Sequence, residues 1–217
     1  MTEASATPAA PTKTLNGVRA FWLKQLHQWH WISASISLVG MVLFSITGIT
    51  LNHAADIPSE PVTVEATATL PAPLVERLRA FPQETTDPVP DAVARWASAE
   101  LKAPVAGRPT ETTPDEIYIA LQAPGGDGWL TIDRATGESV RETTTNGPVA
   151  WMNDLHKGRN TGPVWYWLID IFAVAFIVFA VTGLALLWMH ARNRKSTWPL
   201  VFAGLLIPAV VILIFVH

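Results

Sequence analysis

The chain has 217 residues, of which 49% are hydrophobic and only 15% are charged, and its net charge is −3. Because soluble domains carry about a quarter charged residues, this composition is typical of a membrane protein. The excess of acids argues against a nucleic-acid partner, and the absence of cysteine excludes disulfides, iron–sulfur clusters and thiol chemistry.

The N-terminal part predicts a tail followed by a membrane span. Residues 1–18 are rich in Ala, Thr and Pro, and we expect them to form a disordered cytoplasmic tail. Residues 19–53 follow as the first transmembrane helix, with an uncharged run from Ile32 to Leu51 that can cross a hydrocarbon core of about 30 Å. This run is longer than the apolar region of a signal peptide, which predicts an uncleaved anchor.

Residues 54–153 predict a small α+β domain. The stretch from 55 to 90 is rich in Pro, Thr and Glu and indicates a loop-rich connection, with a short helix in "LVERLRAF". "PDAVARWASAELKA" has the apolar spacing of a helix. "EIYIALQAPGGDGWLTIDRATGESVRET" alternates apolar and polar residues between glycine turns, which predicts two or three short antiparallel strands.

The remaining sequence predicts two further spans. Residues 154–190 hold an outer histidine loop and transmembrane helix 2, residues 191–197 a cytoplasmic loop, and residues 198–217 transmembrane helix 3. Bases cluster before the first span and between the second and third, which predicts a cytoplasmic N-terminus. The expected fold class is a membrane all-α core of three helices with a small α+β extracytoplasmic domain between helices 1 and 2.

Five of the six histidines lie at the ends of the first two spans: His27, His30, His53, His156 and His190. The two spans form a weak inverted repeat, in which a Leu-His pair precedes a Thr-Gly pair and then a second histidine. The repeat consists of Leu26-His27, Thr47-Gly48 and His53 in one span, and Leu155-His156, Thr182-Gly183 and His190 in the other. If the spans pack antiparallel, His53 faces His156 at one end, and His27 or His30 faces His190 at the other.

Two histidines on facing helices are the arrangement that provides both axial ligands of a haem iron. Three histidines at the inner end could instead hold a different metal, and an interfacial histidine can simply be an amphipathic side chain at headgroup level. The Leu-His repeat favours His27 over His30. Because His30 and His53 are about 34 Å apart along a helix, one haem or two both stay open.

Other charged residues near the spans are also candidates for function. Lys157 and Arg159 could pair with haem propionates at the outer surface. Asp170, inside the second span, is a functional candidate because acids are rare there, although capping of interfacial water explains it equally well.

Three pieces carry a resemblance: "LHQWHWISASISLVGMVLFSITGITLNH", "TIDRATGESV" and "DLHKGRNTGPVWYWLIDIFAVAFIVFAVTGLALLW". They resemble the PepSY-associated transmembrane helix family of bacterial inner-membrane proteins, whose larger relatives look like haem b proteins that reduce periplasmic ferric siderophores. The resemblance implies that His53 and His156 ligate an outer haem and that His190, with His27 or His30, ligates an inner one. This chain is shorter, with three spans and at most one PepSY-like unit.

The leading hypothesis is a small b-type cytochrome, multi-pass in the bacterial inner membrane with its large loop in the periplasm. It would hold one or two haem b groups and pass electrons to ferric iron in a siderophore or similar chelate, which leaves a ferric-chelate reductase activity open. The alternatives are a non-enzymatic membrane-anchored PepSY binding module and a haem- or metal-handling accessory subunit. The electron donor and the oligomeric state stay open.

Overall fold

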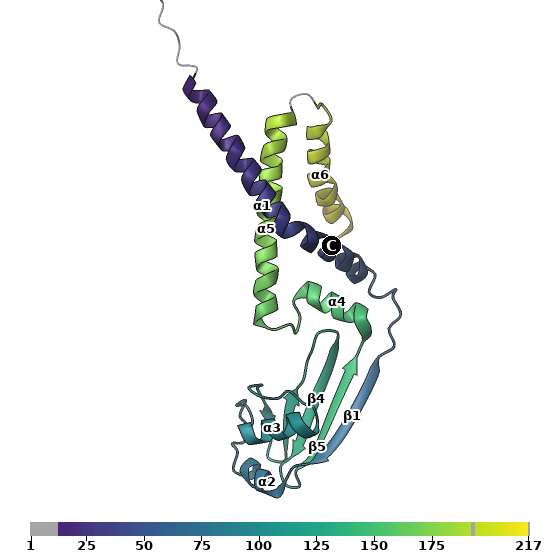
Figure 1. Cartoon of the computed structure of the whole chain (residues 1–217). Helices are drawn as coiled ribbons and strands as arrows, with labels where there is room; N and C mark the ends of the chain where they lie inside the picture. Colours follow the sequence, from purple (N-terminus) through teal and green to yellow (C-terminus); the bar gives the residue numbers. More distant parts are fainter. Residues whose placement is uncertain (1–12, 192–193, 217) are drawn as a thin grey trace, which may run out of the picture. The chain divides into compact units, whose positions relative to one another are not determined.

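A computed structural model describes residues 13–191 and 194–216 (Figure 1). The chain divides into two compact units: a helical unit of Met1–Met41 with Asp170–His217, and an α+β unit of Val42–Ile169. The predicted tail of residues 1–18 falls largely on residues 1–12, outside the described residues, and helix α1 begins at Lys13.

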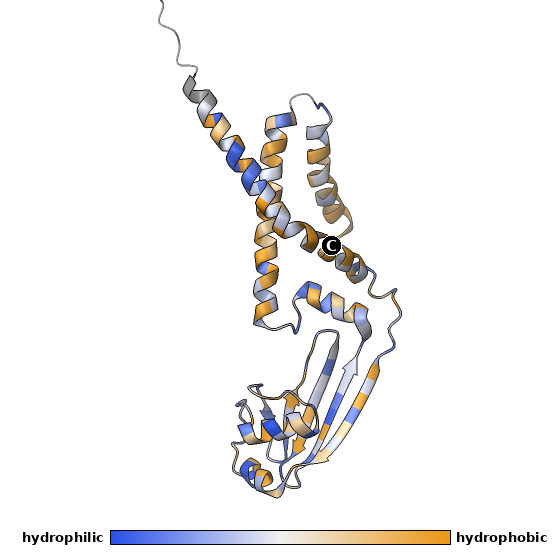
Figure 2. Ribbon diagram, in the orientation of Figure 1, coloured by the Kyte–Doolittle hydropathy of each residue, from blue (hydrophilic) through white to orange (hydrophobic). Residues whose placement is uncertain are grey.

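Three helices are long and apolar enough to cross a membrane: α1 (Lys13–Asn52), α5 (Pro163–His190) and α6 (Thr197–Phe215). Their large apolar side chains are mostly exposed, and hydrophobic colour covers most of α5 and α6 in Figure 2. Apolar side chains that face outward are stable only in a lipid environment. The prediction of three helices long and apolar enough to span a membrane is therefore confirmed for the described residues.

Small and polar side chains fill the interior of the helical unit. Ser33 and Ser37 on α1 and Thr182 on α5 are buried. An added Cβ at Gly40 would lie 2.9 Å from the ring of Phe172, so α1 and α5 approach closely there. Lipid tails are as apolar as leucine, and close contact between membrane helices therefore depends on small residues.

The α+β unit is built on one antiparallel sheet of order β1-β5-β4-β3-β2. Its strands are β1 (Val62–Thr69), β2 (Glu111–Thr112), β3 (Glu116–Ala120), β4 (Gly126–Asp133) and β5 (Glu138–Thr145). Helices α2 (Ala72–Arg79) and α3 (Asp91–Glu100) pack on one face of this sheet (Figure 1). The predicted α+β domain is confirmed, as are its two short helices.

The sheet has five strands where the sequence predicted two or three. Strand β1 lies in the stretch that we expected to be a loop-rich connection, and that expectation was wrong there. This strand pairs only with β5, from Val62 opposite Thr145 to Thr69 opposite Glu138. The sequence of β1, VTVEATAT, does alternate apolar and polar residues. The Pro-, Thr- and Glu-rich composition of the surrounding stretch concealed this signal.

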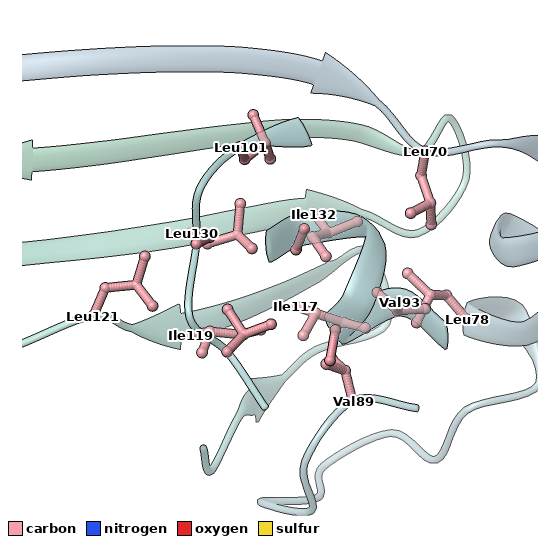
Figure 3. Packing of buried hydrophobic residues seen from close by; sticks show 14 of the residues in the cluster. Leu70, Leu78, Val89, Val93, Leu101, Ile117, Ile119, Leu121, Leu130 and Ile132 are labelled. Atoms are coloured by element: carbon pink, nitrogen blue, oxygen red, sulfur yellow. The ribbon is translucent and has the colours of Figure 1, made fainter. Parts of the chain in front are cut away.

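The core of the α+β unit lies between the sheet and its two helices (Figure 3). Ile117 and Ile119 on β3 and Leu130 and Ile132 on β4 are fully buried, while the residues between them are only half-buried. The period of two places every second side chain on the helix-covered face. Each such aliphatic side chain contributes about 1.5–3 kcal/mol through burial.

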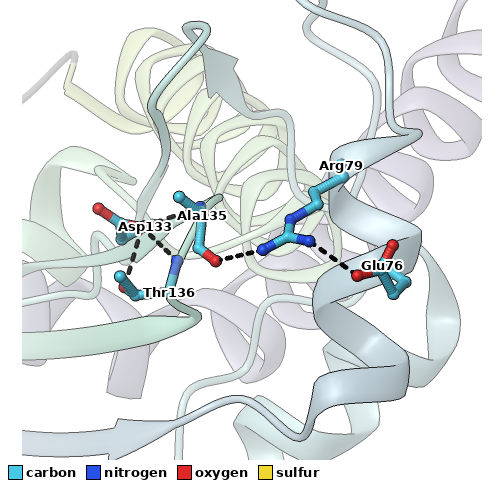
Figure 4. A network of polar contacts seen from close by, with 5 residues as sticks. All are labelled: Glu76, Arg79, Asp133, Ala135 and Thr136. Carbon is cyan, nitrogen blue, oxygen red and sulfur yellow. Dashed lines mark hydrogen bonds and ion pairs between the residues drawn. The ribbon is translucent and has the colours of Figure 1, made fainter.

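A tight turn joins β4 to β5. The Asp133 carboxylate accepts hydrogen bonds from the backbone N–H groups of Ala135 and Thr136, at 2.9 and 2.7 Å, and from the Thr136 hydroxyl at 2.9 Å (Figure 4). These bonds, led by the Thr136 backbone N–H, lower the pKa of Asp133. Arg79 of α2 donates to the Ala135 carbonyl at 2.8 Å and pairs with Glu76, so α2 is tied to the same turn.

Candidate functional site

The described histidines lie on three helices and one helix end. His27 and His30 belong to α1, His53 directly follows α1, and His190 is the last residue of α5. His156 lies on a separate short helix, α4 (Gly147–Lys157), that precedes α5. His217 lies outside the described residues.

The rings of His27 and His190 contact one another in the helical unit, and both side chains are exposed. Their ring centroids are 5.9 Å apart, with an interplanar angle of 85°. Each Nδ1 lies 2.8 Å from the carbonyl oxygen of the residue four positions earlier, Leu23 for His27 and Leu186 for His190. A carbonyl oxygen only accepts hydrogen bonds, so each Nδ1 carries the proton. Both rings therefore keep a free lone pair on Nε2.

This pair has the dimensions of a two-imidazole metal site. Two metal–nitrogen bonds of about 2 Å plus the ring radii place the centroids roughly 6 Å apart. A bare zinc or copper ion usually needs a third protein ligand, and the described residues contain no group of three or more histidines and acids able to hold a metal. In haem the porphyrin supplies four nitrogens, so two imidazoles such as those of His27 and His190 are all that the protein would need to supply.

His30 contacts α5 instead of pairing with His190. Its Nδ1 lies 3.0 Å from the Thr182 hydroxyl and 3.2 Å from the Phe179 carbonyl oxygen. Its ring stacks on the Phe179 ring, at 4.6 Å between centroids and 14° between planes. A Cβ at Gly183 would lie 3.2 Å from His30 Cε1, so only glycine leaves the ring its full space.

His156 occupies a similar environment in the α+β unit. Its Nδ1 lies 2.7 Å from the Thr47 hydroxyl, and its ring centroid lies 5.1 Å from that of Phe44. Gly48 is the neighbouring glycine, where a Cβ would lie 3.6 Å from His156 Cε1. The receiving segments "FSITG" and "FAVTG" place Phe, Thr and Gly at the same spacing.

The threonines determine the tautomer of these two histidines. The hydroxyls of Thr47 and Thr182 each have one proton, which they donate to their own helix, to the carbonyls of Leu43 and Val178. The hydroxyl oxygen then accepts from the histidine Nδ1–H, which leaves Nε2 without a proton. His30 and His156 thus have the same tautomer as His27 and His190.

The sequence did not predict these threonine–histidine contacts. The sequence indicated the Thr-Gly pairs as part of a repeat and the glycines as places of close approach. The signal that could have found the contacts is the phenylalanine three residues before each threonine, which extends the repeat to a five-residue segment.

The contact of the His53 ring that the structure shows is with an acid. Its Nδ1 lies 3.2 Å from the Asp56 carboxylate and its side chain is 57% exposed. Within the described part of the chain, His53 makes no contact with His156, whose Nδ1 is held by Thr47. The predicted ligand pair of His53 and His156 stays a prediction.

The loop "DLHKGRNTG" connects α4 to α5 and to the sheet. Asp154 accepts a hydrogen bond from the Gly125 backbone N–H at 2.8 Å, and Arg159 lies 3.9 Å from the same carboxylate. Gly125 has φ of +72°, and a Cβ there would lie 2.6 Å from the Trp151 backbone, so only glycine fits. Gly125 belongs to the β3–β4 turn, as predicted, and Asp154 fastens α4 to it.

Arg159 also lines a cavity of about 360 Å³ beside the sheet. The face of the sheet that α2 and α3 leave uncovered supplies most of the lining, from strands β3, β4 and β5. Its polar and aromatic members are Tyr118, Gln122, Asp127, Trp129, Glu142, Thr144 and Arg159. The cavity therefore offers two carboxylates, one guanidinium and two aromatic rings to a polar ligand.

Comparisons with known proteins give one match. The family model described as PepSY_TM-like matches residues 21–217, which include most of α1 and the whole of α5, α6 and the α+β unit. No curated protein and no solved structure matches the chain.

Proposed function

The chain belongs to the PepSY_TM-like family, and on that premise we propose that it is a b-type haem protein of the bacterial inner membrane. It passes electrons to a periplasmic acceptor, ferric iron in a siderophore or similar chelate. The observation that carries this proposal is the facing pair His27 and His190, with both Nε2 lone pairs free across a separation that suits one metal ion.

The haem, when bound, supplies reversible one-electron chemistry at its iron. The chain's own residues hold and orient it. The Leu23 and Leu186 carbonyls accept from the Nδ1–H groups of His27 and His190, which fixes both rings and raises the basicity of Nε2. His156 with His53 is the proposed second pair, and the Asp56 carboxylate beside Nδ1 of His53 would leave its Nε2 available for ligation.

The distribution of charge supports the proposed orientation. Arg19, Lys24, Arg194 and Lys195 lie near the ends of the apolar helices, at what the positive-inside rule makes the cytoplasmic side. The acidic α+β unit is then the PepSY-like periplasmic domain. Its cavity beside the sheet, which contains Trp129, Glu142 and Arg159, is the proposed seat of the ferric chelate.

One observation favours the alternative of a non-enzymatic binding module. Strand β1 is an edge of the sheet, and its residues Val62 and Val64 are 61% and 55% exposed. An open edge can take up an extended peptide as a sixth strand. If the protein is such a module, the histidines are interfacial side chains. If it is instead an accessory subunit, they hold haem or metal without redox turnover.

An optical spectrum of the detergent-purified protein, oxidised and dithionite-reduced, tests the proposal. We expect the sharp reduced bands of a low-spin b haem, lost in His27→Ala and in His190→Ala if there is one haem, and halved if there are two. His53→Ala then reports on the second pair. A colourless protein after expression with added haem leaves only the binding module.

The reductase part of the proposal needs a second measurement. The reduced protein is mixed with a ferric chelate, and reoxidation of the haem is followed by its absorbance. Rapid reoxidation that slows in Glu142→Gln supports the proposed seat, whereas a haem that stays reduced supports the accessory role.

A further inference from the structure

A cavity of about 660 Å³ lies in the helical unit, beside the C-terminal end of α5. Residues of α1, α5, α6 and the connection between α5 and α6 contribute to its wall. They are Arg19, Trp188, Met189, Ala191, Arg194, Lys195 and Trp198. Because all of them belong to one compact unit, the cavity is a feature of that unit alone.

Among the described residues, three cationic side chains line this cavity and no acid does. The only carboxylate among the described residues of the helical unit is Asp170, about 30 Å away along α5 from Met189. Within the described residues, Arg19, Arg194 and Lys195 form no ion pair. The protein itself therefore leaves this positive charge uncompensated.

The helix dipoles do not remove this charge. The end of α5 contributes about half a negative charge, and the start of α6, at Thr197, about half a positive one. These two partial charges oppose one another, and either is small beside three full positive charges. The positive charge of this cavity therefore favours the binding of an anion.

The rest of the lining indicates what kind of anion. Trp188 and Trp198 are exposed by 72% and 38%, and tryptophan at a helix end is typical of the headgroup level of a bilayer. With Met189 they form an apolar wall next to the bases. A free phosphate ion would use the bases only, whereas a phospholipid would use the bases for its phosphate and the indoles for its glycerol and upper chains.

We infer that this cavity binds the phosphate group of an anionic phospholipid. Basic pockets between membrane helices are known binding places of acidic headgroups. The lipid would join α1, α5 and α6 at one end of the helical unit, where Trp198 is the first large apolar residue of α6. This inference does not depend on haem.

Native mass spectrometry of the full-length protein, released from nanodiscs, tests it. Discs of phosphatidylglycerol are compared with discs of phosphatidylcholine that have the same chains. We expect phosphatidylglycerol to stay bound and phosphatidylcholine to be lost. Each removed base should weaken retention by about fivefold, so Arg194→Gln with Lys195→Gln should weaken it by about 25-fold.

Lys24→Gln is the matched control, because it removes a base of α1 that does not line the cavity. Equal retention in this control and in the double variant would overturn the inference, as would equal retention of the two lipids. Release of phosphatidylglycerol by millimolar inorganic phosphate would overturn the lipid assignment in favour of a simple anion site. A haem adduct that Arg194→Gln abolishes, found in place of lipid, would assign the bases to the haem carboxylates.

Discussion

The two units of this protein have opposite interiors. In the α+β unit the fully buried side chains are mainly Leu, Ile and Val, such as Leu130 and Ile132. In the helical unit the buried side chains include Ser33, Ser37 and Thr182, while most of the large apolar ones face outward. Burial of apolar surface stabilises the first, and close approach of small residues with polar contacts stabilises the second.

This difference shows where a ligand can be held. The core between the sheet and its helices is filled with aliphatic side chains, so the proposed ligand seat lies on the uncovered face of the sheet. The helical unit already has polar groups between its helices. Histidines can therefore lie there without replacing aliphatic core residues.

The largest expected effect comes from the same change made in both units. Leu130→Ala removes a fully buried side chain and should lower the free energy of unfolding of the α+β unit by about 2–5 kcal/mol. Leu205→Ala removes a side chain of α6 that is 68% exposed, and it should leave the stability of the helical unit unchanged. Hydrogen exchange, followed by mass spectrometry of the full chain, measures the first effect at the β4 and β5 amides and the second at the α6 amides. Equal loss of protection in the two variants would contradict the comparison.

A methyl group added between two membrane helices should have the next largest effect. In Gly40→Ala the new Cβ would lie 2.9 Å from the Phe172 ring, and such overpacking costs about 1–3 kcal/mol. Gly204→Ala on α6 is the control, because its Cβ would meet nothing within 4 Å. Thermal unfolding in detergent should show a lower midpoint for the first variant only. An unchanged midpoint for Gly40→Ala would mean that α1 and α5 are not in close contact there.

The polar contact inside the helical unit should have a smaller effect. Thr182→Val removes the hydroxyl that accepts from His30 Nδ1–H. A hydrogen bond between membrane helices is worth about 0.6 kcal/mol, so the ratio of the His30 tautomers should change about threefold. ¹⁵N NMR of histidine-labelled protein measures this ratio, and Thr182→Ser, which keeps the hydroxyl, should restore it. Identical spectra for Thr182→Val and the parent protein would refute the tautomer assignment.

The smallest effect is expected at the exposed turn between β4 and β5. Hydrogen bonds lower the pKa of Asp133 in the folded state, so its stabilising contribution is complete above the pKa of the unfolded chain, about 4. That contribution is lost as the pH falls from there through the lower folded pKa. Amide exchange at Thr136 should therefore lose protection below about pH 4, and Asp133→Asn should remove this pH dependence. The same pH dependence in the Asn variant would show that another group is responsible.

The sequence predicted the elements of the fold better than their partners. Long uncharged runs located all three membrane helices, because bilayer thickness sets a minimum length that few other structures need. Alternation located strands β3 and β4, whose buried residues face one helix layer. Strand β1 was missed although VTVEATAT also alternates, because it lies in a stretch whose Pro, Thr and Glu content indicated a loop.

In the candidate site, too, the sequence predicted the positions of residues better than their contacts. The repeat in the sequence favoured His27 over His30 as the partner of His190, and the structure places the His27 and His190 rings 5.9 Å apart. The partner of His30 is Thr182, which is 152 residues away and was not predicted. Nothing in the local sequence specifies the rotation of one helix about its axis relative to another.

The sequence by itself determined the number of membrane helices, the α+β class of the second unit and the placement of histidines at helix ends. These properties follow from hydropathy and periodicity, which act over neighbouring residues. Only the tertiary structure decided that His30 and His156 lie against threonines and that Asp154 fastens α4 to the Gly125 turn. The His30 contact depends on how residues such as Ser37, Gly40 and Phe172 pack, because packing sets the depth and rotation of each helix against its neighbour.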